Sequence, residues 1–190
     1  MKKYMQAVTM LWLSWTMAAG VQAAQDYVWI EGEQPAASNF EWKASGWGPE
    51  GMLSADQWLL QSNRRKLDGD ALELDYEFEV EAAGTYNIWL RIGYEWMRPK
   101  CTWRIDDGPE TTVGLGLGPL AEGKETGIPN DVERLSTNVK YVDTWCEVAW
   151  WNLGEAELSP GKHRLALSFT RTSEPDPLLA LDAVCVVQGD

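Results

Sequence analysis

The sequence is poor in the residues on which nucleophilic and acid–base catalysis commonly depend. It contains one histidine, His163, and three cysteines among its 190 residues. A cysteine nucleophile needs a base beside it, and no local pattern joins His163 to any of the three cysteines. No serine–histidine or tyrosine–lysine set can be assembled either, so we expect a protein without catalytic activity.

Basic side chains are also scarce. The chain carries 16 Lys and Arg against 29 Asp and Glu, which gives a formal net charge of −13. Nucleic acids and anionic membranes are bound by Lys and Arg side chains that neutralise phosphates, so neither partner is expected. A simpler explanation of the acidic surface is the solubility of an exported protein.

Helical periodicity is missing as well, and no internal repeat is found. Apolar and polar residues alternate strictly over 72–80 and again over 86–92. This period of two is typical of strands with one buried and one wet face, and the small residues 82–84 between them predict a hairpin. Further strands are expected at 27–33, 40–43, 55–61, 101–105, 111–113, 145–158, 162–170 and 178–187. About eight to ten short strands separated by Gly and Pro turns predict an all-β fold, an antiparallel β-sandwich of jelly-roll type, with a closed barrel as the alternative.

Residues 1–24 are predicted to be a secretory signal peptide. Two lysines precede an apolar run from about Val8 to Ala19, and small residues then lead to a cleavage position after Ala23 or Ala24. The apolar run is shorter than a membrane span and no second run follows, so no membrane span is expected. We expect a secreted or periplasmic product in which residues 25–190 form a single domain.

Three features of the chain are assigned structural roles. Cys101, Cys146 and Cys185 each lie among strand-like apolar residues and are expected to be buried there; the alternative is one disulfide bridge with a third cysteine unpaired. His163 lies on the apolar side of its strand, and we expect it to pack there rather than act as a base or metal ligand. The glycine-rich segment 114–118 precedes neither a Gly-Lys-Ser/Thr sequence nor a helix, so it does not predict a phosphate-binding loop.

Five motifs occur in an order that resembles a known group of proteins. They are YVWIEGE (27–33), AAGTYNIWLRIG (82–93), WRIDDGP (103–109), LSPGKHRLALSF (158–169) and LALDAVCVV (179–187). In this order they resemble the galactose-binding-domain-like β-sandwiches and, among these, the carbohydrate-binding modules of families 6 and 35. The resemblance covers about residues 27–188, and it implies a β-sandwich that binds carbohydrate without converting it.

The resemblance also implies a structural calcium ion between the first and last strands. Such modules hold the ion through acidic residues of an E-x-E segment and an Asp near the end, which match Glu31, Glu33 and Asp182. Carboxylate oxygens suit Ca²⁺, but three side chains cannot complete a shell of about six or more ligands, so backbone carbonyls or water must contribute. Gly32, where the family often has Ala, is a departure from the pattern. The alternative is that Glu31 and Glu33 are solvated acids at a strand end.

A carbohydrate site needs aromatic rings that stack on a sugar and a few fixed polar groups that bond its hydroxyls. Ten of the 12 tryptophans follow the predicted leader, more than a core of this size requires, so some should be exposed. Trp47 and Trp96 lie in loops marked by Gly or Pro and are the first candidates. Trp89 is the next candidate, because it shares the polar side of its strand with Asn87 and Arg91.

Two other functions are kept open. One is a small polysaccharide lyase or hydrolase of jelly-roll form, and the other is a structural or adhesive surface module that binds protein. If the chain is a binding module, we expect it to act alone, to work beside a separately encoded glycan-degrading enzyme, or to be a truncated gene product.

Overall fold

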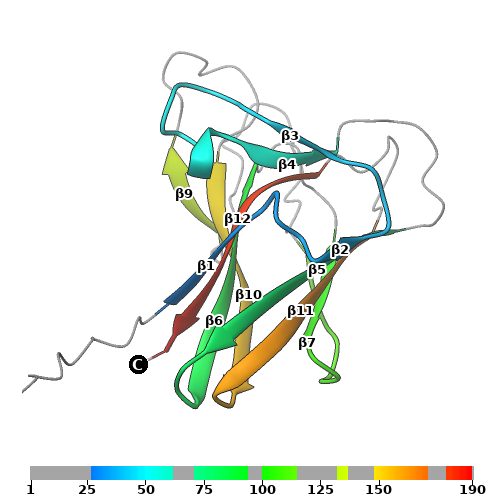
Figure 1. The fold of residues 1–190 in the computed structure, drawn as a ribbon, viewed down its shortest axis with the longest axis vertical. Helices are drawn as coiled ribbons and strands as arrows, with labels where there is room; N and C mark the ends of the chain where they lie inside the picture. The colour runs from blue at the N-terminus through cyan, green and yellow to red at the C-terminus, as the bar shows by residue number, and fades with distance from the viewer. Residues whose placement is uncertain are drawn as a thin grey trace, which may run out of the picture.

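Two antiparallel β-sheets pack face to face in the computed structural model, which describes residues 27–61, 71–93, 100–114, 132–136, 148–170 and 179–189 (Figure 1). The larger sheet has the order β3-β4-β12-β6-β10-β9, with β1 also paired to β12. Its strands are β1 (Tyr27–Glu31), β3 (Lys43–Ser45), β4 (Trp58–Gln61), β6 (Gly84–Gly93), β9 (Val132–Ser136), β10 (Val148–Leu158) and β12 (Leu179–Gln188). The smaller sheet has the order β2-β5-β11-β7-β8, formed by β2 (Ala37–Ser38), β5 (Ala71–Val80), β7 (Lys100–Ile105), β8 (Thr111–Gly114) and β11 (Gly161–Thr170). The predicted β-sandwich is confirmed.

Helical structure in these described ranges is limited to one 3₁₀ turn, Ser54–Asp56. Accordingly, no described helix is long and apolar enough to cross a membrane.

The alternation over 72–92 gives the correct burial but the wrong pairing. Along β5 the apolar residues are buried and the glutamates exposed, and β6 buries its own alternate residues, as predicted. The two strands do not form a hairpin: β5 pairs with β11 and β2, whereas β6 pairs with β12 and β10. The turn at 81–83 therefore carries the chain from one sheet to the other. Alternation fixes which side of a strand is buried, and two strands that face each other across a core satisfy it as well as two neighbours do.

The hydrophobic core lies between the sheets and draws large side chains from both. Tyr76 of β5, Ile88 of β6 and Trp151 of β10 are all fully buried in one cluster. Strand β12, in the interior of the larger sheet, is buried over most of its length. A smaller cluster lies near the β3–β4 end of the larger sheet and consists of Leu53, Trp58, Leu60, Val148 and Ala180.

Two cysteines are buried in strands without a disulfide, which confirms the prediction for them. Cys101 and Cys185 are free thiols, and burial raises the pKa of Cys185 to about 11 and that of Cys101 further. Both thiols are therefore protonated and unreactive at neutral pH. Cys146 lies outside the described residues.

His163 of β11 is buried beside the turn that connects β7 and β8. Its ring is tilted against Phe78 at a centroid distance of 5.6 Å. Nδ1 lies 2.8 Å from Oδ2 of Asp106, and Nε2 lies 2.8 Å from the carbonyl oxygen of Ser159. Both partners accept hydrogen bonds when Asp106 is ionised, so the geometry favours the doubly protonated imidazolium. The expectation that His163 packs in its strand is confirmed.

The His163–Asp106 pair predicts a pH-dependent contribution to stability. Burial lowers the pKa of His163, but the hydrogen bonds with Asp106 and Ser159 and the charge of Asp106 outweigh burial and raise it. Because the pKa of His163 is higher in the folded than in the unfolded state, protonation of His163 stabilises the folded state. This stabilisation is complete below the unfolded pKa of about 6.5 and is lost as the pH rises through the folded pKa. We expect His163→Phe to lower the free energy of unfolding more at about pH 5.5 than at about pH 9, measured by urea unfolding.

An equal cost of His163→Phe at both pH values would contradict the ion pair. Asp106→Asn serves as the partner variant, because it removes the same charge interaction and should show the same pH trend. The other charged groups around this pair are Glu77, Glu79, Lys162 and Arg164.

Candidate functional site

The outer face of the larger sheet carries a group of tryptophans. Trp29 of β1, Trp89 of β6 and Trp150 of β10 point away from the core, because the described residues that alternate with them are buried in the core or pack against it. The register places Trp29 opposite Cys185 of β12, and Cys185 opposite Trp89, so these side chains form a row across the strands. We call the surface formed by Trp29, Trp89, Trp150, Asn87 and Asn152 the tryptophan face.

The rings of the tryptophan face are accessible and hold each other in place. Trp29 and Trp150 meet edge to face, with ring centroids 5.6 Å apart and planes at 84°, an arrangement that aromatic quadrupoles favour. Trp29 is 37% exposed, and Tyr27 on the same side of β1 is 45% exposed. A shallow, open hollow of about 200 Å³ is lined by Trp89, Trp150, Cys185 and Val187. Exposed aromatic surface of this kind typically marks an interaction site.

Two amides lie beside the rings and are oriented by the backbone. Asn152 and Gly154 bracket a β-bulge in β10, and Gly154 has a φ of +127°, which glycine tolerates. The Gly154 N–H donates to Oδ1 of Asn152 at 2.8 Å, and Nδ2 of Asn152 donates to Oδ1 of Asn87 at 3.4 Å. Asn87 uses its Oδ1 in this contact, and its Nδ2 group has no hydrogen-bond acceptor among the described residues, so it can donate to a ligand.

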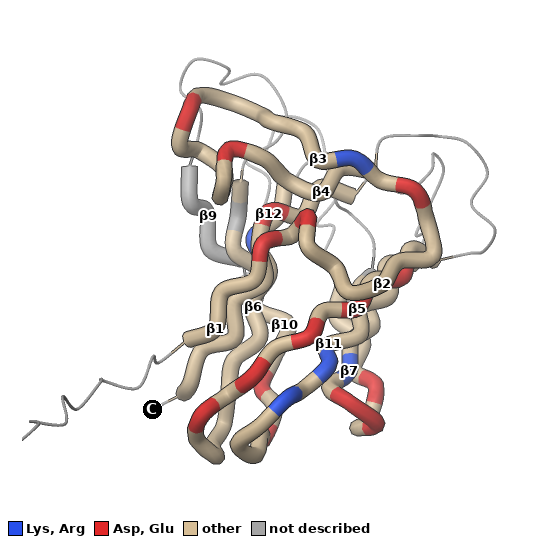
Figure 2. Tube along the Cα trace, in the orientation of Figure 1, with Lys and Arg blue, Asp and Glu red and all other residues tan. Residues whose placement is uncertain are grey.

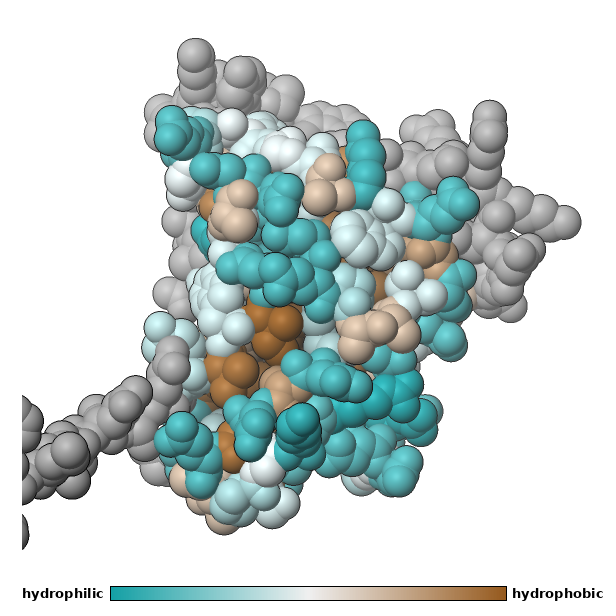
Figure 3. Space-filling view, viewed as in Figure 1, coloured by the Kyte–Doolittle hydropathy of each residue, from teal (hydrophilic) through white to brown (hydrophobic). Residues whose placement is uncertain are grey.

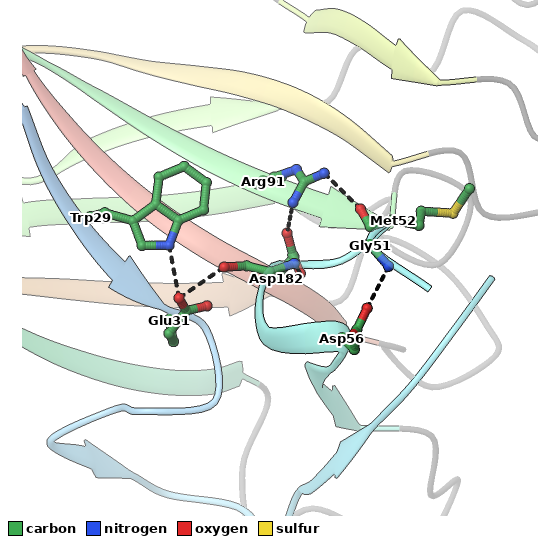
Figure 4. A network of polar contacts seen from close by, with 8 residues as sticks. Trp29, Glu31, Gly51, Met52, Asp56, Arg91 and Asp182 are labelled. Carbon is green, nitrogen blue, oxygen red and sulfur yellow. Dashed lines mark hydrogen bonds and ion pairs between the residues drawn. The ribbon is translucent and has the colours of Figure 1, made fainter. Parts of the chain in front are cut away.

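A buried ion pair lies at one end of the tryptophan face (Figure 4). The Asp182 carboxylate is completely buried, and its Oδ2 lies 2.5 Å from Nη1 of Arg91. Nη2 of Arg91 donates to the carbonyl oxygen of Met52 at 2.7 Å, and the backbone N–H of Ser54 donates to Oδ1 of Asp182 at 2.9 Å. The pair therefore ties the 52–54 segment to strands β6 and β12.

Asp182 owes its position to an irregularity in β12. The register between β12 and β6 shifts between Leu181 and Ala183, so Asp182 is the extra residue of a β-bulge. Burial raises the pKa of Asp182 to about 6, although the charge and hydrogen bond of Arg91 and the Ser54 N–H act to lower it. The direction indicates that desolvation outweighs the stabilisation that the arginine provides.

Glu31 and Glu33 lie at the end of β1 and just beyond it, and each has one satisfied and one unsatisfied oxygen. Oε1 of Glu31 accepts from the indole N–H of Trp29 at 3.1 Å and from the Ser54 hydroxyl at 2.8 Å. Oε1 of Glu33 accepts from Nε2 of Gln57 at 2.9 Å. Oε2 of each glutamate is buried with no hydrogen-bond partner among the described residues. Because an unpaired buried carboxylate oxygen is costly, these two oxygens are candidate ligands for a hard cation.

Gly32, between the two glutamates, is required by close packing. Its N–H donates to the carbonyl oxygen of Asp182 at 2.8 Å, and the Tyr76 hydroxyl donates to its carbonyl oxygen at 2.6 Å. A Cβ at this position would lie 2.1 Å from the carbonyl oxygen of Leu181, too close for any side chain. This contact explains why position 32 has Gly rather than the Ala that the resemblance would suggest.

The outer face of the smaller sheet is charged rather than aromatic. Acidic side chains along β5 lie beside basic ones on β11, as the red and blue segments of these strands show (Figure 2). One such pair joins Arg164 and Asp75 at 2.5 Å. The visible surface over β5 and β11 is correspondingly hydrophilic, and apolar residues show in the seam between β1 and β5 (Figure 3).

The structure brings part of the predicted carbohydrate set together. Trp89 and Asn87 lie on the tryptophan face, while Arg91 turns its guanidinium to Asp182 and Met52. Trp47 is half-buried and packs against the smaller cluster around Leu53 and Trp58. Trp96 lies outside the described residues.

Two tryptophans of the face were not among the candidates. Trp29 alternates with the half-buried Val28 and Ile30, so its outward direction is readable from the pattern of β1. In the sequence of β10, Trp150 alternates with Trp151 and so falls on the same side of the strand as the polar Asn152. Trp151 and Leu153, on the opposite side, are buried, so this alternation indicates that Trp150 points outward.

The predicted metal set is divided in the structure. The Asp182 carboxylate bonds Arg91 and Ser54, whereas Glu31 and Glu33 each retain a buried oxygen. Within the described ranges, no group of three or more His, Cys, Asp or Glu side chains is placed to hold a metal ion. A cation here would depend on the two glutamates together with backbone carbonyls or water.

Comparison with known proteins gives structural likeness only. No family model matches the sequence, and no curated protein matches it. A family 35 carbohydrate-binding module (Xyl-CBM35, solved in complex with a glucuronic acid-containing disaccharide) superposes with a TM-score of 0.53 at 12% identity, covering 86% of this chain and 94% of that one. The family 35 module of Cellvibrio japonicus Abf62 gives a TM-score of 0.50 at 14% identity, with the same coverages of 86% and 94%.

A larger protein shows the same likeness. The Podospora anserina GH26-CBM35 β-(1,4)-mannanase gives a TM-score of 0.52 at 8% identity, and the match covers 87% of this chain but only 28% of the mannanase. The chain is thus an all-β sandwich with a galactose-binding-domain-like fold. Its fold is that of the family 35 carbohydrate-binding modules, as the order of the motifs predicted.

Proposed function

We propose that the protein is a non-catalytic carbohydrate-binding module that recognises polysaccharide or glycan through its tryptophan face. The observation that carries the proposal is the row of outward side chains on β1, β12 and β6, with Trp150 edge-on to Trp29. Aromatic rings present apolar faces on which sugar rings stack, and nearby amides bond sugar hydroxyls. The fold shared with carbohydrate-binding modules supports the same conclusion.

Each residue of the face has a distinct part in this proposal. Trp29 and Trp89 provide stacking surfaces, and Trp150 supports Trp29 from the side. Asn87 and Asn152 supply the directional hydrogen bonds. Arg91 stabilises Asp182 and the 52–54 segment instead of contacting sugar.

Affinity electrophoresis tests the proposal. The protein without residues 1–24 is run in native gels that contain soluble plant, algal or animal polysaccharides, and we expect its migration to be slowed by at least one of them. Retention by none, or release of reducing sugar or unsaturated uronides from a retained polysaccharide, would contradict a binding module.

The predicted signal peptide and the role of a module fit a secreted or periplasmic protein that acts beside a separately encoded glycan-degrading enzyme.

We also propose that Glu31 and Glu33 bind a structural Ca²⁺. Their buried Oε2 atoms have no hydrogen-bond partner among the described residues and are suitable ligands for a hard cation. A bound cation would neutralise the negative charge of the two carboxylates. In this proposal Asp182, the third predicted ligand, positions Glu31 indirectly. Asp182 accepts a hydrogen bond from the Ser54 N–H, and the Ser54 hydroxyl donates to Glu31.

Calcium is expected to raise the melting temperature. An ion that binds only the folded state stabilises it by RT ln(1 + [Ca²⁺]/Kd), about 2.7 kcal/mol at a concentration one hundred times Kd. Thermal melting in CaCl₂ and in EGTA measures the shift, which Glu33→Gln should abolish and Glu73→Gln, at an exposed position of β5, should preserve. An unchanged melting temperature of the wild type would contradict the calcium site.

A further inference from the structure

We infer that the tryptophan face takes an internal stretch of an electrically neutral polysaccharide and discriminates against chains that carry carboxylates. This inference rests on the proposed function and specifies its ligand. It depends on the charges around the face and on the shape of the face.

Arg91, a described cation in register with the face, is already neutralised. Arg91 lies in register with Trp150, but its two terminal nitrogens bond the buried Asp182 carboxylate and the Met52 carbonyl oxygen, and its side chain is only 17% exposed. Releasing the guanidinium to a sugar carboxylate would leave the buried Asp182 carboxylate without its positively charged partner, which is strongly unfavourable. Arg91 is therefore not available to recognise an anionic sugar.

Among the residues whose side chains the structure describes, the remaining charges near the face are negative. The exposed Glu155 lies in register with Asn87, and the exposed Glu157 lies in register with Thr85 on the same pair of strands. The chain as a whole has a net charge of −13. A polyuronate would bring further negative charge against these carboxylates, and like-charge contacts oppose binding. Rings and amides, in contrast, suit uncharged sugars with apolar faces and hydroxyls.

The shape of the face favours the interior of a chain over its end. The residues that line the hollow, Trp89, Trp150, Cys185 and Val187, all belong to strands, so the platform is a sheet surface. It runs across the strands from Trp29 on β1 to Asn152 on β10, and neighbouring strands lie about 4.8 Å apart. An open surface several strands wide accommodates consecutive sugars, whereas recognition of a chain end needs an enclosed pocket.

Matched polysaccharides that differ in charge test the inference. Native gels contain hydroxyethylcellulose or carboxymethylcellulose, guar galactomannan or its C6-carboxylated form, and neutral arabinoxylan or glucuronoxylan. We expect retention by a neutral member and about tenfold or more weaker retention by its carboxylated counterpart. Retention should be lost in Trp89→Ala and should change little between low and physiological salt, because the interaction is not ionic.

The outcomes separate the inference from the proposed function. Equal or stronger retention by the carboxylated members, still lost in Trp89→Ala, would overturn the neutral ligand and keep the binding face. No retention by any member, or retention that Trp89→Ala leaves unchanged, would overturn the proposed function itself. For internal recognition, affinity must rise with the length of oligosaccharides from the retained polymer, and equal affinity for a monosaccharide would overturn it.

Discussion

Arg91→Met is expected to destabilise the protein by about 3–5 kcal/mol, because it leaves a buried carboxylate without its partner. Asp182 is completely buried, and burial already raises its pKa to about 6 with Arg91 in place. The substitution also removes the donor to the Met52 carbonyl oxygen, so the 52–54 segment loses an attachment to β6. Urea unfolding followed by tryptophan fluorescence, with EGTA present, measures the change.

A surface arginine provides the control for this prediction. Arg104 lies 3.8 Å from Glu110, and both side chains are well exposed, so Arg104→Met should cost less than about 1 kcal/mol. The double variant Arg91→Met/Asp182→Leu should recover much of the loss, because it removes the unpaired charge. A loss below about 1 kcal/mol for Arg91→Met alone would show that the pair does not hold this end of the sheet.

Removing the rings of the tryptophan face is expected to weaken carbohydrate binding. Trp29→Ala and Trp89→Ala should each weaken affinity for the retained polysaccharide by about tenfold, or about 1.4 kcal/mol, as aromatic anchors of binding sites do. The two rings lie on different strands, so the double variant should lose about a hundredfold. Affinity electrophoresis and isothermal titration calorimetry measure both losses.

Trp47→Ala is the matched control for this prediction. Trp47 is half-buried against the smaller cluster and is not one of the residues that form the face, so its replacement should leave affinity within about twofold of wild type. Circular dichroism checks that each variant is folded. If Trp47→Ala abolishes binding while Trp29→Ala and Trp89→Ala retain it, the loop that was the first candidate from the sequence carries the site.

Alternation in the sequence predicts burial well and pairing poorly. The buried and exposed residues of β5 and β6 follow from their period of two, and so does the sandwich. Their separation into different sheets does not, because a turn between sheets and a hairpin turn both connect alternating strands. The bulges at Asp182 and Leu153 are likewise invisible in the pattern, since they arise from how neighbouring strands meet.

The candidate site could be predicted in part for the same reason. The outward direction of Asn87 and Trp89 is a property of one strand, whereas their proximity to Trp29 and Trp150 depends on the strand order β1-β12-β6-β10. Arg91 lies on the same side of β6 as Asn87 and Trp89, so the pattern predicts an outward side chain. Its ion pair with Asp182, the extra residue of the bulge, could not be predicted from that pattern. Glu31 and Glu33 were identified by resemblance, and their unpartnered oxygens emerge only from the packing around them.

The most direct test of carbohydrate binding at the tryptophan face is an NMR titration of the tryptophan indole N–H resonances with an oligosaccharide of the retained polymer. We expect the resonances of Trp29, Trp89 and Trp150 to shift, and those of Trp103 and Trp151, which are buried in the core, to stay in place. Unshifted resonances of the face alongside shifts of Trp47 or Trp96 would contradict the account.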